Sequence, residues 1–111
     1  MSVIDRLRKR RFYPVTIDGE VIHIRALLDS ELKTVSAFQN EDESIGFAIG
    51  CSLINEDKSD VFTIAADESA KQFGARVLAE INLPSDTKAE LTSKILKLSN
   101  GPPSAEDLKK N

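Results

Sequence analysis

The sequence has few of the residues that catalysis or metal binding requires. Its 111 residues include one cysteine, Cys51, one histidine, His23, and no tryptophan. A single cysteine cannot form an intrachain disulfide, which favours a reducing compartment. One cysteine and one histidine do not supply the ligand cluster of a zinc site, so we expect neither a metal nor another cofactor.

The chain also lacks a long hydrophobic run. No apolar stretch approaches the ~18–20 residues that cross a bilayer, and no apolar segment of a secretion signal follows the basic start. We therefore expect no membrane association and a location in the cytosol of the cell that makes the protein. Hydrophobic residues make up 41% and charged residues 30% of the chain, as in ordinary globular domains.

The residues that could carry out chemistry stand alone. His23 falls in an expected strand, without the second positioned group that general acid–base catalysis needs. Cys51 lies among small residues with no histidine nearby, which favours a buried inert thiol over a nucleophile. Gly46 and Gly50 lack the Lys-Ser/Thr of a phosphate-binding loop. We therefore predict that the protein is not an enzyme.

Basic residues are concentrated at the N-terminus of a chain whose net charge is −3. Residues 1–11, the basic N-terminal arm, hold five bases and one acid, which leaves 10 bases and 17 acids, a net charge of −7, in residues 12–111. This acidic body repels phosphates, so nucleic acid is a disfavoured partner. A helical arm would place Val3, Ile4 and Leu7 on one side and suit docking on a protein, including a second copy. The bases of the arm are Arg6, Arg8, Lys9, Arg10 and Arg11.

Residues 12–25 have the pattern of a β-hairpin. Asp18-Gly19 is a favoured two-residue turn, because glycine tolerates positive φ. Such a turn pairs Ile17 with Glu20. Pro14 cannot donate to a strand ladder, so its strand is expected at a sheet edge. The face expected to pack on the rest of the protein comprises Tyr13, Val15, Ile17, Ile22 and Ile24.

Four segments with helical periodicity follow the hairpin. The second of them, Ser44–Ile54, contains two glycines four residues apart, which are tolerable if another backbone packs closely there. The candidate N-terminal caps or helix starts are, in chain order, Asp29 or Ser30, Asn40–Glu43, Thr63 or Asp67, and Ser85 or Asp86. The expected inward stripes are Leu32, Val35 and Phe38; Ile45, Ile49 and Leu53; Ala66, Ala70, Phe73, Val77 and Ile81; and Leu91, Ile95 and Leu98.

The order of these elements predicts an α+β fold, because strands and helices do not alternate as in a βαβ chain. We expect an N-terminal β-hairpin followed by a mostly α-helical bundle of about four helices. Residues 12–101 form the single domain, between the arm at 1–11 and a flexible C-terminal tail at 102–111.

Four short segments resemble the tail assembly chaperones of long-tailed, lambda-like bacteriophages and prophages. They are the hairpin Phe12–Leu27, the helix start Asp29–Leu32, "DVFT" at Asp60–Thr63 and "KILKLSNG" at Lys94–Gly101. The resemblance implies a non-enzymatic protein of the host cytoplasm that binds the tape measure protein, keeps it soluble during tail assembly and is absent from the mature virion. It also implies self-association and contact with the major tail protein.

The candidate partner-binding residues follow from this resemblance and from the charge pattern. An apolar client helix would suit a groove near the small-residue segment and the edge of the hairpin. The alternative for the glycines and Leu53 is ordinary core packing. The candidates are Arg6, Arg8, Lys9, Arg10, Arg11, Gly46, Gly50 and Leu53.

The chain ends in Lys109-Lys110-Asn111, which can be encoded by the slippery heptamer A AAA AAC. The resemblance implies a longer form made by −1 ribosomal frameshifting near this point. The alternative is a chance occurrence in a polar tail.

Two other functions remain open. The protein could be a structural tail or head-completion component, which would be found in purified virions. It could also be a small nucleic-acid-binding accessory protein that uses the arm, in which case its affinity would fall steeply with salt.

Overall fold

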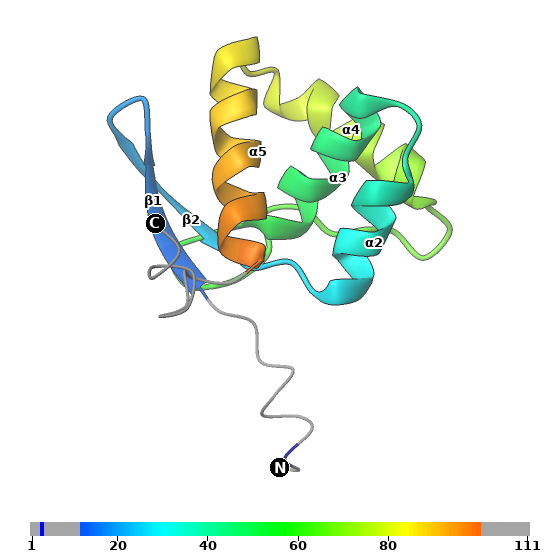
Figure 1. Cartoon of the computed structure of the whole chain (residues 1–111), viewed down its shortest axis with the longest axis horizontal. Coiled ribbons are helices and arrows are strands. Elements are labelled where there is room, and N and C mark those ends of the chain that lie inside the picture. The colour runs from blue at the N-terminus through cyan, green and yellow to red at the C-terminus, as the bar shows by residue number, and fades with distance from the viewer. Residues whose placement is uncertain (1–2, 4–11, 101–111) are drawn as a thin grey trace, which may run out of the picture.

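The computed structural model describes residue 3 and residues 12–100, and it has the expected α+β architecture (Figure 1). The strands β1 (Phe12–Ile17) and β2 (Glu20–Arg25) form an antiparallel hairpin. Among the described residues, four helices are assigned after it: α2 (Asp29–Ala37), α3 (Glu41–Ser52), α4 (Ala70–Ile81) and α5 (Ser85–Ser99). A short strand, β3 (Leu53–Ile54), pairs with β2, so the described sheet has the order β1-β2-β3.

The hairpin has the predicted register and turn. Ile17 pairs with Glu20, and the two turn residues, Asp18 and Gly19, have φ values of 52° and 81°. Both values lie in the left-handed region, as a tight two-residue hairpin turn requires. β1 lies at an edge of the described sheet, which agrees with the prediction from Pro14.

Replacing Gly19 by alanine should destabilise the protein by about 1 kcal/mol, because a Cβ makes the left-handed conformation costly. The space around Gly19 is open, so the effect would come from backbone conformation and not from a clash. Urea unfolding measures it. Asp18→Asn is the matched control, since asparagine tolerates positive φ and its side-chain oxygen can still accept the hydrogen bond of Thr87. Equal stability of the two variants would contradict the prediction.

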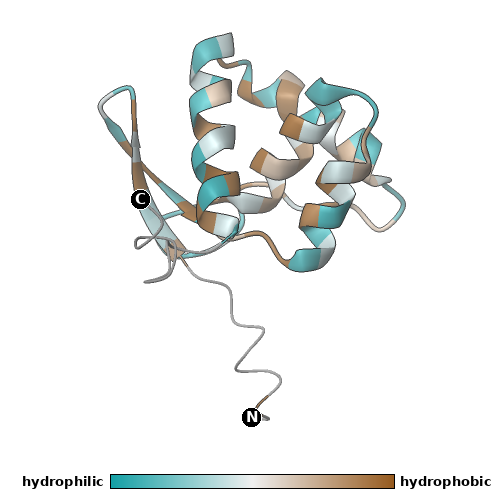
Figure 2. Cartoon of the chain, viewed as in Figure 1, coloured by the Kyte–Doolittle hydropathy of each residue, from teal (hydrophilic) through white to brown (hydrophobic). Residues whose placement is uncertain are grey.

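The helices and the hairpin meet in one core. α3 contacts each of the other three helices, and α5 packs against both long strands (Figure 1). Beyond its acidic first turn, α3 is coloured white to brown, as expected for the central helix (Figure 2). The buried cluster draws on the hairpin, α3, α4, α5 and Leu27, whereas α2 contributes only partly buried residues that pack against it. The cluster comprises Ile17, Ile24, Leu27, Phe47, Ala48, Ile49, Phe73, Val77, Leu91 and Ile95.

The predicted start of the first helix is close, but its cap is wrong. Asp29 and Ser30 lie inside the first turn of α2, and Leu28 occupies the cap position. The N–H of Leu28 donates to the carboxylate of Glu31 at 2.8 Å, so a side chain within the helix satisfies the backbone. In α3, by contrast, the side chain of Asn40 accepts from the N–H of Glu43 at 3.2 Å, within the stretch expected to start that helix.

The caps predicted for the last two helices are also wrong. α4 begins at Ala70, after both Thr63 and Asp67, because Ser69 and Gln72 cap it reciprocally. Ala66 of the predicted stripe therefore lies outside the helix. In α5, the predicted caps Ser85 and Asp86 fall in the first turn, and Pro84 precedes them at the cap position without a side-chain hydrogen bond.

The second predicted helix is too long at its C-terminal end. Leu53 and Ile54 leave the helix and pair with Ile24 and His23 of β2. Ser52, which is fully buried, donates its hydroxyl to the carbonyl oxygen of Arg25 at 2.6 Å. The chain is thereby fastened to β2 at the point where the helix ends, which a helical periodicity cannot reveal.

Candidate functional site

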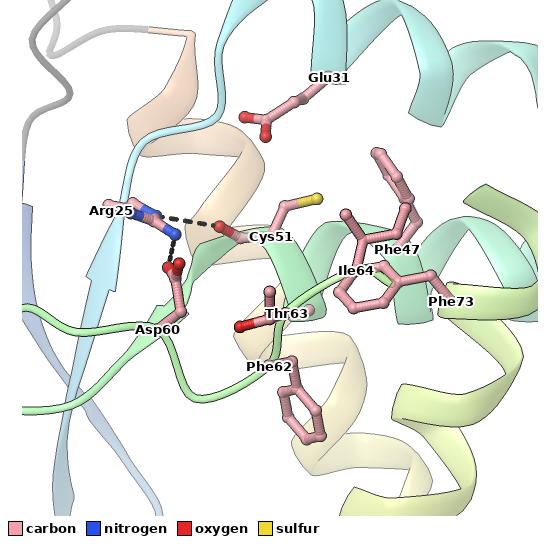
Figure 3. A pocket seen from close by; sticks show the side chains of 10 residues that line it. Arg25, Glu31, Phe47, Cys51, Asp60, Phe62, Thr63, Ile64 and Phe73 are labelled. Carbon is pink, nitrogen blue, oxygen red and sulfur yellow. Dashed lines mark hydrogen bonds and ion pairs between the residues drawn. The ribbon is translucent and has the colours of Figure 1, made fainter. Parts of the chain in front are cut away.

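A pocket of about 260 Å³ opens beside the C-terminal end of α3 (Figure 3). Its walls come from the end of β2, from α2, α3 and α4, and from the irregular segment between β3 and α4. Charged side chains lie at one side of it and aromatic side chains at the other. The lining residues are Arg25, Glu31, Phe47, Gly50, Cys51, Asp60, Phe62, Thr63, Ile64 and Phe73.

Arg25 organises the charged side of the pocket. Its Nε donates to the carbonyl oxygen of Cys51 at 3.2 Å, and its guanidinium forms an ion pair with Asp60. Cys51 lies in the last turn of α3, where carbonyl groups lack helical partners and the helix dipole favours a cation. Arg25 therefore joins three parts of the wall: β2, the end of α3 and the segment that follows β3.

Aromatic residues form the apolar side. The rings of Phe47 and Phe73 meet edge to face, with centroids 6.1 Å apart, and the ring of Phe38 is tilted by 52° against that of Phe47, with centroids 5.7 Å apart. These geometries are favourable for aromatic pairs. Ile64 completes this side and is 46% exposed, so the apolar wall continues onto the surface.

Arg76 of α4 holds residues 60–69, the pocket segment, against the helices. It donates to Glu68 through Nε at 2.9 Å and through a terminal nitrogen at 3.0 Å, and also to the carbonyl oxygen of Thr63 at 2.8 Å. The hydrogen bond from Arg76 lowers the pKa of Glu68 below its ordinary value of 4.5, and the reciprocal bond raises the pKa of Arg76. Glu68 in turn accepts from the N–H of Ala65 at 3.1 Å.

Replacing Arg76 by glutamine should loosen the pocket segment and speed its cleavage by chymotrypsin at Phe62. Low pH should act in the same direction. The pKa of folded Glu68 is lowered, so its contact with Arg76 is fully present above pH 4.5 and is lost as the pH falls through the lower folded value. Lys71→Gln is the matched control, because Lys71 is exposed and lies 3.9 Å from Glu43. Cleavage at the same rate in all three proteins would contradict this role of Arg76.

The glycines of α3 lie at its contact with α4. Gly46 is buried, and a Cβ built there would collide with the carbonyl oxygen of Gly74. A Cβ on Gly50 would come within 2.7 Å of the ring of Phe73 and of a methyl group of Val77. The close approach of another backbone, which the sequence predicted at these glycines, is present at Gly46, where Gly74 of α4 makes it. At Gly50 the close neighbours are side chains of α4 and not its backbone.

The structure separates the predicted partner-binding residues. Gly50 lines the pocket, Gly46 is buried one turn away, and Leu53 pairs with Ile24 in the sheet. The arm residues Arg6, Arg8, Lys9, Arg10 and Arg11 lie outside the described residues. Whether these eight residues bind a partner stays a prediction.

Two residues that shape the site, Ile64 and Arg76, were not expected from the sequence, and Asp60 and Phe62 were noted only as part of the segment "DVFT". A usable signal was present in "VFTI" at 61–64, an apolar run between two polar stretches that belongs to no helix or strand. Asp60 and Arg76 gave no such signal, because their partners lie 35 and 8 residues away in the chain.

Within residue 3 and residues 12–100, no group of three or more His, Cys, Asp or Glu side chains is placed to hold a metal ion. His23 lies in β2, where it pairs with Pro14 on one side and Ile54 on the other. That the protein is not an enzyme and uses no cofactor therefore stays a prediction from the sequence. In the same part of the chain, no helix is both long and apolar enough to cross a membrane.

Comparison with known proteins gives no match: no family model, no curated protein and no solved structure is significantly similar to the chain.

Proposed function

We propose that this chain is a non-enzymatic tail assembly chaperone of a long-tailed bacteriophage or prophage. In this role it binds the tape measure protein and keeps it soluble during tail assembly. The main support is a spatial relation between the four segments that resemble this family in sequence. Although these segments are spread along the chain, contacts bring parts of them together near the C-terminal ends of β2 and α5.

Direct contacts connect three of these segments, and a residue of the fourth lines the same pocket. Arg25, in the hairpin segment, forms an ion pair with Asp60, the first residue of "DVFT". Leu27, at the end of the same segment, donates its N–H to the hydroxyl of Ser99 in "KILKLSNG" at 2.8 Å. Glu31, in the helix-start segment, accepts from the N–H of Leu28 and lines the pocket that Asp60 also lines. The resemblance therefore falls on residues that build one region, as a shared binding surface would require.

The pocket is the surface that best suits an apolar client helix. Its aromatic side is continued at the surface by Ile64, which is 46% exposed. An amphipathic helix binds by placing apolar side chains into such a groove.

Co-expression tests the proposal. The chain is produced together with the tape measure candidate, a long helical protein encoded in the same gene cluster. We expect the candidate to be insoluble alone and soluble, in a complex with this chain, when both are made. A tape measure candidate that stays insoluble, or that is soluble without this chain, would refute the proposal. So would recovery of the chain in purified virions, which would support a structural role.

The proposal includes a location in the host cytoplasm, self-association and contact with the major tail protein. It also includes a frameshifted longer form. The nucleotide sequence tests that form: A AAA AAC at Lys109–Asn111 with an open −1 frame beyond it would support the longer form, and a broken heptamer would exclude slippage at this position.

A further inference from the structure

We propose that the basic N-terminal arm, residues 1–11, binds the acidic surface around the pocket of its own chain. The contact would be intramolecular and would need no partner protein. It goes beyond the chaperone function proposed above and would stand if that function were refuted.

Acidic residues are concentrated in one part of the domain. Residues 29–68 contain ten acids and two bases, a net charge of −8, whereas the other described residues from 12 to 100 contain five acids and six bases. The negative charge of the domain therefore belongs almost entirely to α2, α3 and the irregular segment before α4. Of these acids, Glu31 and Asp60 line the pocket, whereas Glu41–Glu43 lie in the first turn of α3, at the opposite end of that helix. The arm carries five bases and one acid, a net charge of +4. Opposite charges on two parts of one chain favour their contact.

The arm joins the domain close to the pocket. Phe12, the first residue after the arm, pairs with Arg25, which lines the pocket and binds Asp60. The ammonium group of Lys58 lies 5.0 Å from the centre of the Phe12 ring. The loop that holds Glu56, Asp57 and Asp60 is thus beside the start of the arm.

The arm is long enough to reach the pocket. Leu7 is five residues before Phe12, and an extended chain spans at most ~3.6 Å per residue, so Leu7 can lie up to ~18 Å from it. Because Arg25 is the paired neighbour of Phe12, the pocket lies within this range. A binding segment tethered so closely has an effective concentration of order mM, which favours the arm of the same chain over that of a second copy.

The chemistry of the two surfaces also matches. Two apolar residues of the arm, Ile4 and Leu7, suit the apolar side of the pocket at Phe73 and Ile64, whereas Val3 is 60% exposed. The bases of the arm suit Glu31 and Asp60, which lie on either side of the charged end (Figure 3). The arm would cover exposed apolar surface in the isolated protein, and any helix that binds the pocket would have to displace it.

The test uses the full chain, labelled with ¹⁵N, and compares amide chemical shifts between the wild type and a variant with all five arm bases replaced by glutamine. We expect shift differences at Glu31, Cys51 and residues 60–64, unchanged when the protein is diluted tenfold. High salt should move the wild-type shifts toward those of the variant, because it screens the contact. Lys109→Gln/Lys110→Gln, which removes bases from the other end of the chain, is the matched control and should leave the pocket amides unchanged.

A second variant probes the acceptor surface. Glu56→Gln removes an exposed carboxylate from the loop beside Phe12 and should shift the amides of residues 6–11. Three results would overturn the proposal: pocket amides that do not respond to the arm variant, responses no larger than in the control, or responses that disappear on dilution. The last result would assign the contact to the arm of a second copy.

Discussion

Replacing Gly46 by alanine should lower the free energy of unfolding by about 2 kcal/mol or more. In an exposed helix the same change stabilises by up to about 1 kcal/mol, because alanine is the better helix former. Here a Cβ would meet the carbonyl oxygen of Gly74, which is part of the α4 backbone and cannot rotate away. The two helices would have to separate, and their separation would disturb the contacts of Phe47 and Phe73 in the core.

Urea unfolding of the purified protein measures this effect. Ser93→Ala is the matched control, because Ser93 is exposed in the middle of α5 and should change stability by no more than about 0.5 kcal/mol. Gly74→Ala should resemble Gly46→Ala, since its Cβ would approach the backbone of Glu43 and Phe47. If Gly46→Ala were as stable as the wild type, the close contact of α3 and α4 would be refuted.

Replacing Ile64 by aspartate should weaken binding of the tape measure candidate about tenfold or more. The proposed contact is apolar, and burying an unpaired carboxylate in it is costly. A cost of about 1.4 kcal/mol already corresponds to a tenfold loss of affinity. Because Ile64 is 46% exposed, the change should leave the stability of the protein itself almost unaltered. The amount of candidate that remains soluble on co-expression is the readout, together with the affinity of the purified complex.

Val21→Asp is the matched control for this experiment. Val21 is 63% exposed in β2 and does not line the pocket. The Val21→Asp variant therefore adds the same charge at an exposed apolar position outside the pocket. Loss of client binding in Ile64→Asp alone would support the pocket as the binding surface. Equal loss in both variants would instead favour the hairpin or a general effect of charge, and no loss in either would refute the pocket as the client surface.

The hairpin could be predicted almost completely from the sequence. Its register depends on a two-residue turn and on alternation of apolar residues, both of which are local properties of residues 12–25. The number and order of the helices were predictable for a similar reason. The apolar residues that recur at helical spacing, such as Phe73, Val77, Leu91 and Ile95, are the buried ones.

The starts of the helices were less predictable, because several residues of the right type compete for each cap. Thr63, Asp67 and Ser69 can all cap a helix in principle. In the structure Ser69 is the cap. Arg76, which lies inside the helix, donates hydrogen bonds to Glu68 and to the carbonyl oxygen of Thr63, and the residues near the cap do not reveal these contacts. These contacts keep the preceding residues outside the helix.

The sequence by itself determined the fold class, the hairpin register, the inward faces of the helices and the need for a close neighbour at Gly46 and Gly50. Only the tertiary structure decided which neighbour that is, where α3 gives way to β3, and that a pocket lies between Arg25, Asp60 and Ile64. The physical reason is the range of the interactions. Turns and amphipathic periodicity act between residues a few positions apart, whereas Gly46 meets Gly74, and Arg25 meets Asp60, only after the chain has folded.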